Sequence, residues 1–224
     1  TDKSGLDSMG AIAKECEPDD ENTYGGYFEL GANIPYNGIY SGIMPANTPD
    51  EATGFIGVFD GCGYTIDGLQ INEGDNTAAS GALSAYNNNH SIFGVIHGAT
   101  IKNIKFTNAV IEIKGSLIAT IGSGLVENIY VSFAAIQYNG ESNRIALAFG
   151  QSAQTGATIK DCVIDLSNTS YSGRYGNDTS YTFPVFGYWT ILEGVYVIGE
   201  GPTGYNPFSL WTPNDTAVYG MYDT

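Results

Sequence analysis

Side chains suited to acid–base or nucleophilic chemistry are few in this sequence of 224 residues. It has two histidines, His90 and His97, and a Ser/His/Asp arrangement would have to use one of them. No residue nearby is marked as a nucleophile, and no CxxC or Cys/His spacing indicates zinc. We therefore interpret both histidines as exposed loop residues and predict no catalytic residue and no metal site.

Carboxylates are the second group of candidate catalytic residues, because polysaccharide lyases and glycosidases use paired carboxylates or Ca²⁺ beside a basic residue. Those near the predicted strands are Asp60, Asp67, Glu127, Asp161 and Glu193. Three of them, Asp67, Glu127 and Glu193, fall at equivalent or near-equivalent turn positions. Lys102 and Lys160 lie alongside, which predicts a solvated ladder of charges rather than a site. Asp60, in a Phe-Asp-Gly sequence, is predicted to stabilise a turn through its side chain.

Aromatic side chains are the feature best suited to binding. The chain has 16 tyrosines and 2 tryptophans, and many of them fall in its last third. Exposed rings stack on the apolar faces of sugars, while neighbouring Asn and Asp bond to sugar hydroxyls. Together with a predicted loop at residues 167–182, the candidate ligand-binding residues are Tyr171, Tyr175, Tyr188, Trp189, Tyr205 and Trp211. The competing interpretation, which we favour, is that these rings pack a carboxy-terminal cap; a peptide or protein ligand would use the same residue types.

Five short apolar triplets indicate the elements that would position these side chains. In each, an apolar residue is followed by two polar or small residues, a second apolar residue, any residue, and a third apolar residue. The triplets are Ile66/Leu69/Ile71, Ile101/Ile104/Phe106, Val126/Ile129/Val131, Ile159/Cys162/Ile164 and Leu192/Val195/Val197. They recur at intervals of about 25 to 35 residues, a period typical of solenoids whose turns stack. The alternation predicts short strands with one buried face, so we expect every triplet residue to point inward.

The residue that precedes the short strand in each triplet also follows a pattern. It is Gly, Asn or Asp in every case: Gly68, Asn103, Asn128, Asp161 and Gly194. These residue types tolerate a left-handed backbone better than the others. We therefore expect a sharp left-handed corner in each turn of the chain. Helices are not expected there, because the turns are rich in Gly, Asn and β-branched residues.

The best of these stretches resembles a known repeat. Residues 55–71, FIGVFDGCGYTIDGLQI, and residues 92–106, IFGVIHGATIKNIKF, resemble the GLUG-type repeats of bacterial cell-surface and secreted proteins. Related stretches occur in the β-helical amino-terminal regions of IgA-protease-like surface proteins. The resemblance extends over residues 24–199 and is strongest over residues 55–106. It implies a right-handed parallel β-helix of about five to six turns, with a role in display or adhesion and no active site.

Composition favours an exported protein. The 24 acidic and 8 basic residues give a net charge of −16, which argues against nucleic acids and anionic membranes as partners. This charge would suit cationic partners or Ca²⁺, although simple solubility is the favoured explanation. No segment reaches the roughly 18 apolar residues of a membrane span, and no signal peptide opens the sequence. We therefore expect an extracellular or cell-surface location, with this chain a mature form or a domain of a larger protein.

The ends of the chain are predicted to differ from its middle. We divide it into residues 1–23, 24–200 and 201–224, as a helical cap with an acidic loop, a β-helix, and a carboxy-terminal cap or tail. An amphipathic helix over residues 4–16, capped by Ser4 or Asp7, would cover the open solenoid end. Its predicted apolar face is Leu6, Met9, Ile12 and Ala13. The acidic stretch at residues 15–22 is favoured as a solvated charge run over a Ca²⁺ site, so no cofactor is predicted.

Three cysteines are too few for a disulfide framework. Cys162 occupies a triplet position and is predicted to be a small buried hydrophobe. Whether Cys16 reaches Cys62 is left open by the sequence.

Three functions are compatible with these patterns. The favoured one is a non-catalytic cell-surface or secreted module that serves in adhesion or as a display spacer, with a host or environmental glycan or protein as partner. The second is a glycan-binding module that uses the carboxy-terminal aromatic residues. The third is a divergent polysaccharide lyase or glycosidase, which is disfavoured because no basic residue accompanies clustered carboxylates.

Overall fold

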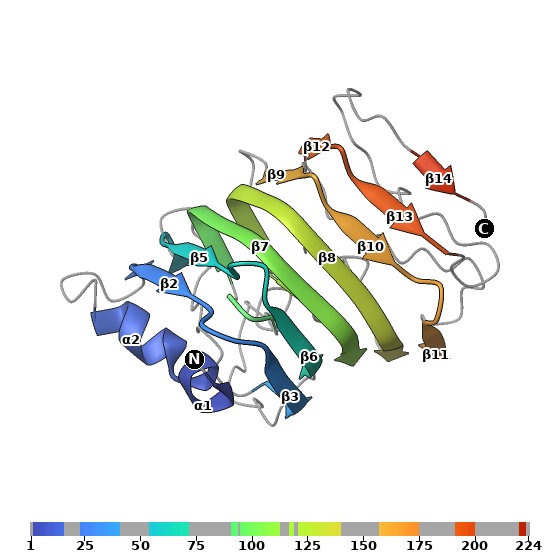
Figure 1. Ribbon diagram of the computed structural model, residues 1–224, viewed down its shortest axis with the longest axis horizontal. Coiled ribbons are helices and arrows are strands. Elements are labelled where there is room, and N and C mark those ends of the chain that lie inside the picture. Colours follow the sequence, from blue (N-terminus) through green and yellow to red (C-terminus); the bar gives the residue numbers. More distant parts are fainter. Residues whose placement is uncertain are drawn as a thin grey trace.

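The chain forms an all-β structure with two short helices at its amino-terminal end (Figure 1). The computed structural model describes residues 2–15, 23–40, 54–71, 91–93, 95–112, 117–118, 121–139, 157–174, 191–199 and 220–222. The strands are β1 (Thr23–Tyr24), β2 (Tyr27–Glu29), β3 (Ile34–Ile39), β4 (Gly54–Phe55), β5 (Val58–Asp60), β6 (Thr65–Ile71), β7 (Val95–Glu112), β8 (Ile121–Asn139), β9 (Ala157–Lys160), β10 (Val163–Asp165), β11 (Ser170–Arg174), β12 (Ile191–Glu193), β13 (Tyr196–Ile198) and β14 (Gly220–Tyr222).

These strands belong to one 14-stranded sheet, and every pairing in the described part of the chain is parallel. One path through the sheet runs β1-β4-β7-β8-β10-β13-β14. Strands β7 and β8 are the longest and pair along most of their length. In Figure 1 the helices lie at one end of this row of strands and β14 lies at the other. Each return of the chain therefore adds a strand beside the one laid down before it.

The predicted register is correct from β7 onward. Ile101 pairs with Val126, Val126 with Ile159, and Ile159 with Leu192. The third apolar positions follow the same order, from Phe106 through Val131 and Ile164 to Val197. Neighbouring strands lie about 4.8 Å apart, so each column of like residues forms a continuous apolar stack.

The predicted register is wrong for the first triplet. Phe59, not Ile66, pairs with Ile101, and Ile66 pairs with Phe106. The cause is the corner between Phe59 and Ile66, which is longer than the later corners. It closes with a hydrogen bond from the Tyr64 N–H to the Gly61 carbonyl at 2.8 Å, and Cys62 within it has a φ of 51°. Because of the extra residues, Ile66 falls opposite the third apolar position of the next triplet, Phe106, rather than the first.

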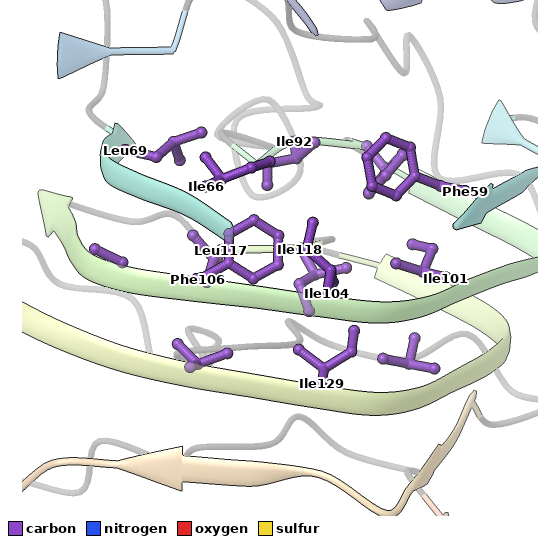
Figure 2. Packing of buried hydrophobic residues seen from close by; sticks show 14 of the residues in the cluster. Phe59, Ile66, Leu69, Ile92, Ile101, Ile104, Phe106, Leu117, Ile118 and Ile129 are labelled. Atoms are coloured by element: carbon purple, nitrogen blue, oxygen red, sulfur yellow. The ribbon is translucent and has the colours of Figure 1, made fainter. Parts of the chain in front are cut away.

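The core lies behind the inward faces of these strands. Every predicted triplet residue is buried, with at most 5% of its surface exposed, as expected. Figure 2 shows Phe106, Ile104 and Ile101 of β7 in a row, with Ile129 of β8 in the next row. The apolar segments at residues 91–93 and 117–118, which the triplets did not include, are buried against the same core. There Ile92 and Phe93 donate backbone hydrogen bonds to the carbonyls of residues 117 and 118 at 3.1 and 3.0 Å.

Left-handed corners occur in two columns rather than one. The predicted column holds Asn103, Asn128 and Asp161, with φ of 55°, 52° and 52°, and it continues at Gly194 with φ of 60°. Gly68 also has a positive φ, 68°, but it belongs to a second column with Asn37 and Asn108. The reason is that β6 pairs with the later part of β7, where Asp67 lies opposite Thr107. Asn and Gly share these corners since both tolerate the left-handed region.

The amino-terminal helix is in fact two helices, α1 (Lys3–Asp7) and α2 (Met9–Glu15). Asp2 caps α1 by accepting a hydrogen bond from the Gly5 N–H at 3.0 Å, in place of the predicted Ser4 or Asp7. Ser8 separates the two helices although its N–H still donates to the Ser4 carbonyl, and Ile12 of α2 is 47% exposed, contrary to the prediction. The other predicted apolar residues are buried: Leu6, Met9 and Ala13.

The two helices lie against the first strands of the sheet. Helix α1 contacts β3, and α2 contacts β1. The Asp7 carboxylate accepts a hydrogen bond from the Tyr36 hydroxyl, and the Lys3 ammonium lies 4.3 Å from the centre of the same ring. Residues 16–22 and 201–219 lie outside the described residues, so the three-part division at 1–23, 24–200 and 201–224 stays a prediction.

Candidate functional site

A row of alternating charges crosses the sheet at the first corner. Asp60 pairs with Lys102, Lys102 with Glu127, Glu127 with Lys160, and Lys160 with Glu193. The Lys102 ammonium lies 3.4 Å from a carboxylate oxygen of Asp60. Opposite charges on neighbouring strands stabilise a sheet. The predicted ladder is therefore present, but Asp60 stands in it where the sequence placed Asp67.

The Asp60 carboxylate is occupied by structural hydrogen bonds. One oxygen accepts the Cys62 N–H at 2.8 Å, which confirms the predicted turn role, and the Asn103 amide at 3.0 Å. Asn103 in turn accepts a bond from the Asn128 amide at 2.8 Å, so the corner side chains form a ladder. Burial raises the pKa of Asp60, but the bonds from Cys62, Asn103 and Lys102 outweigh it, and the net pKa is lowered. This carboxylate therefore acts as a hydrogen-bond acceptor for the corner.

Two further carboxylates are used in the same way. Asp67 accepts the Thr107 hydroxyl at 2.6 Å and the Asn108 amide at 2.8 Å, and these two bonds lower its pKa. Burial raises the pKa of Asp165, but hydrogen bonds from the Ser167 hydroxyl, the Ser167 N–H and the Tyr130 hydroxyl lower it overall. All three carboxylates are therefore held in the ionised form, each by donors from a turn or a neighbouring strand.

Acid should weaken this structure in a way that depends on Asp60. Its folded pKa lies below the unfolded value of about 3.9, so the stabilisation is present above that pH and is lost as pH falls through the folded pKa. We expect the free energy of unfolding, measured with urea, to fall between about pH 5 and pH 2, and to fall less steeply in Asp60→Asn. Parallel pH profiles for the two proteins would contradict this assignment.

The residues with nucleophilic or acid–base potential are not gathered in the described part of the chain. His97 lies in β7 and is half-buried, so it is not the exposed loop residue that was predicted, and His90 lies outside the described residues. Cys162 is buried as expected, and burial raises the pKa of its thiol to about 12. Cys62 is a free, exposed cysteine, and Cys16 lies outside the described residues. Among the residues that the structure places, no three His, Cys, Asp or Glu side chains are arranged to hold a metal ion.

One of the predicted binding aromatics can be placed. Tyr171 lies in β11 opposite Ile136 and is half-buried, with its ring packed against the core. Burial also raises the pKa of its hydroxyl. This position agrees with the packing role that we favoured for these rings. The other candidates lie outside the described residues: Tyr175, Tyr188, Trp189, Tyr205 and Trp211.

The sheet presents an outward row of side chains that the sequence analysis did not single out. Lys105 pairs with Tyr130, Tyr130 with Val163, and Val163 with Tyr196, so the four lie on adjacent strands in one line. We call these four residues the tyrosine row. They occupy the unconstrained position between the second and third apolar residues of four triplets. Alternation along the strand places that position on the outer face, which is the signal that could have identified it.

The two tyrosines of the row differ in exposure. The Tyr196 side chain is exposed, with 41% of its surface accessible, whereas Tyr130 is half-buried. The Tyr130 hydroxyl donates to an oxygen of Asp165 at 2.8 Å. Asp165 follows Val163, the pairing partner of Tyr130, by two residues on the same strand, so the phenol ring extends across β10 along the sheet surface. The row thus offers one exposed ring and one ring anchored along the outer face.

Comparisons with protein-family models, with curated proteins and with solved structures give no match in any of the three. None of the helices in the described part of the chain is long and apolar enough to cross a membrane.

Proposed function

We propose that this chain is a right-handed parallel β-helix module of a bacterial cell-surface or secreted protein, related to the GLUG-type repeat proteins. It acts in adhesion or as a display spacer, and it is not catalytic. The observation that supports this best is the parallel register that repeats from Ile101 through Val126 and Ile159 to Leu192. A stack of this kind is rigid along its length and presents its outward positions in regular rows.

The use of the carboxylates supports a non-catalytic role. Asp60, Asp67 and Asp165 each accept hydrogen bonds from corner or strand neighbours. A glycosidase site would need carboxylates directed at a substrate, with one of them held protonated. Lys102 does lie beside Asp60, contrary to the sequence-based expectation that no basic residue accompanies the carboxylates, but Asp60 is occupied by hydrogen bonds at the corner. The lowered pKa values of these three groups are those of structural acceptors.

The net charge of −16 supports export and a partner that is neither nucleic acid nor an anionic membrane. The partner on this proposal is a host or environmental glycan or protein, and neighbouring domains of a larger protein would supply anchoring. The glycan-binding alternative through the carboxy-terminal aromatic residues remains a prediction, as does the divergent lyase or glycosidase.

An assay for polysaccharide cleavage tests this proposal. The purified chain is incubated with acidic and neutral polysaccharides, with and without Ca²⁺, and new reducing ends and unsaturated products are measured. We expect no product above the buffer control. Turnover that scales with protein concentration would overturn the non-catalytic assignment and would favour the lyase or glycosidase.

A further inference from the structure

We infer that the tyrosine row, Lys105, Tyr130, Val163 and Tyr196, is a binding surface for a neutral polysaccharide chain that lies across the strands. This inference rests on the proposed adhesion function and adds a ligand class and a site. It uses residues other than the candidate carboxy-terminal aromatics, on the outer face of β7, β8, β10 and β13.

The spacing of the row matches a sugar chain. Tyr130 and Tyr196 lie two strands apart, with Val163 between them. The backbones at Tyr130 and Tyr196 are two strand spacings, about 10 Å, apart, and the Tyr130 ring extends across β10 toward Asp165. A sugar chain that lies across the strands would therefore stack one unit on the Tyr130 ring over β10 and a later unit on the Tyr196 ring of β13. Aromatic rings suit this role because the axial C–H faces of pyranoses are apolar.

The anchored ring of Tyr130 lowers the conformational entropy that is lost when a ligand binds. Its hydroxyl is held by Asp165, and the other Asp165 oxygen accepts the Ser167 N–H at 2.9 Å. A side chain that is already held loses little conformational freedom when a ligand stacks on it. The ionised Asp165 carboxylate also retains acceptor capacity for a sugar hydroxyl beside the ring.

The charges around the row select against acidic glycans. Asp165 lies beside Tyr130, Lys105 is the one cation within the row, and the whole chain carries a net charge of −16. A polyuronate or a sulfated glycan would be repelled over its length by this field. Neutral polysaccharides are not repelled by this charge, and their hydroxyls can donate hydrogen bonds to carboxylate acceptors. The ligand that complements this face is therefore a neutral polysaccharide.

Binding to defined polysaccharides tests the inference. The full 224-residue chain is titrated with cello-oligosaccharides, manno-oligosaccharides and xylo-oligosaccharides of six units, and with oligogalacturonate as the acidic comparison, by calorimetry and affinity electrophoresis. We expect binding to at least one neutral series and none to oligogalacturonate. Tyr196→Ala should weaken binding about fivefold, and Tyr196→Phe should retain it because the ring remains.

The matched control is Tyr27→Ala, because Tyr27 is an exposed tyrosine on the outer face of a different strand, β2. It should leave affinity unchanged. Tyr130→Phe keeps the ring but removes the bond to Asp165, so we expect a smaller loss than for Tyr130→Ala. Thermal melts of each variant separate lost binding from lost folding, and Tyr196 is exposed enough for its alanine variant to fold.

Two results would overturn the inference: no binding of the wild-type chain to any neutral series, or equal affinities of wild type, Tyr196→Ala and the Tyr130→Ala/Tyr196→Ala double variant. Preferential binding of oligogalacturonate would refute the choice of a neutral ligand. Cleavage of a bound oligosaccharide would instead contradict the non-catalytic function while leaving the binding surface in place, so the two failures are distinguishable.

Discussion

Replacing Phe106 with alanine is expected to reduce the free energy of unfolding by about 3–5 kcal/mol. Phe106 is 1% exposed and lies in the middle of its column, between Ile66 of β6 and Val131 of β8. Removing the ring leaves a cavity bounded by two neighbouring strands, and a close-packed stack cannot collapse to fill it without breaking the strand register. Urea denaturation, followed by circular dichroism, measures the loss.

Lys105→Ala is the matched control for that substitution. Lys105 is adjacent to Phe106 on the same strand but faces outward and is exposed. Its replacement should change stability by no more than about 0.5 kcal/mol. If Phe106→Ala and Lys105→Ala shift the unfolding midpoint equally, the assignment of inward and outward faces on β7 is wrong.

Gly124→Ala is expected to destabilise the chain by more than about 3 kcal/mol, or to prevent folding. Gly124 has a φ of 124°, well beyond the left-handed helical basin that Asn and Asp tolerate. A Cβ at this position would lie 2.3 Å from the carbonyl oxygen and 2.8 Å from the nitrogen of Ala99 on the neighbouring strand. Both obstacles are backbone atoms of a paired strand, so the conflict cannot be relieved by moving a side chain.

Gly98→Ala is the control that separates the backbone strain of a positive φ from the steric overlap of an added Cβ. Gly98 also has a positive φ, 64°, but a Cβ added there meets nothing within 4 Å. The cost should be limited to the left-handed backbone, about 1–2 kcal/mol. Soluble expression and thermal melts of both variants measure the difference. A Gly124→Ala protein as stable as Gly98→Ala would show that β7 and β8 are not as closely apposed at Ala99 as the structure has them.

Much of the architecture follows from local sequence patterns. Alternation along a strand decides which residues face inward, and all five triplets are buried as that rule requires. The left-handed corners at Asn103, Asn128 and Asp161 were predictable because few residue types tolerate that backbone. Both features depend on neighbours in the chain, which a sequence displays directly.

The split of the amino-terminal helix illustrates where local patterns fail. The spacing of Leu6, Met9 and Ile12 suits one amphipathic helix. In the structure α1 packs against β3 and α2 packs against β1, and Ile12 of α2 is exposed. Packing of two short helices against separate strands is a tertiary effect, and helical periodicity carries no information about it.

The surface that we propose as a binding site was decided by the tertiary structure. Lys105, Tyr130, Val163 and Tyr196 are far apart in the chain and occupy a position that the repeat leaves unconstrained. The sequence determined by itself that each of them faces outward, because strand alternation is a local property. Only the parallel pairing of distant strands made them neighbours and brought the Tyr130 hydroxyl to Asp165. Strand pairing also matched Phe59 rather than Ile66 with Ile101, because the relative shift of two strands depends on the length of the corners between them.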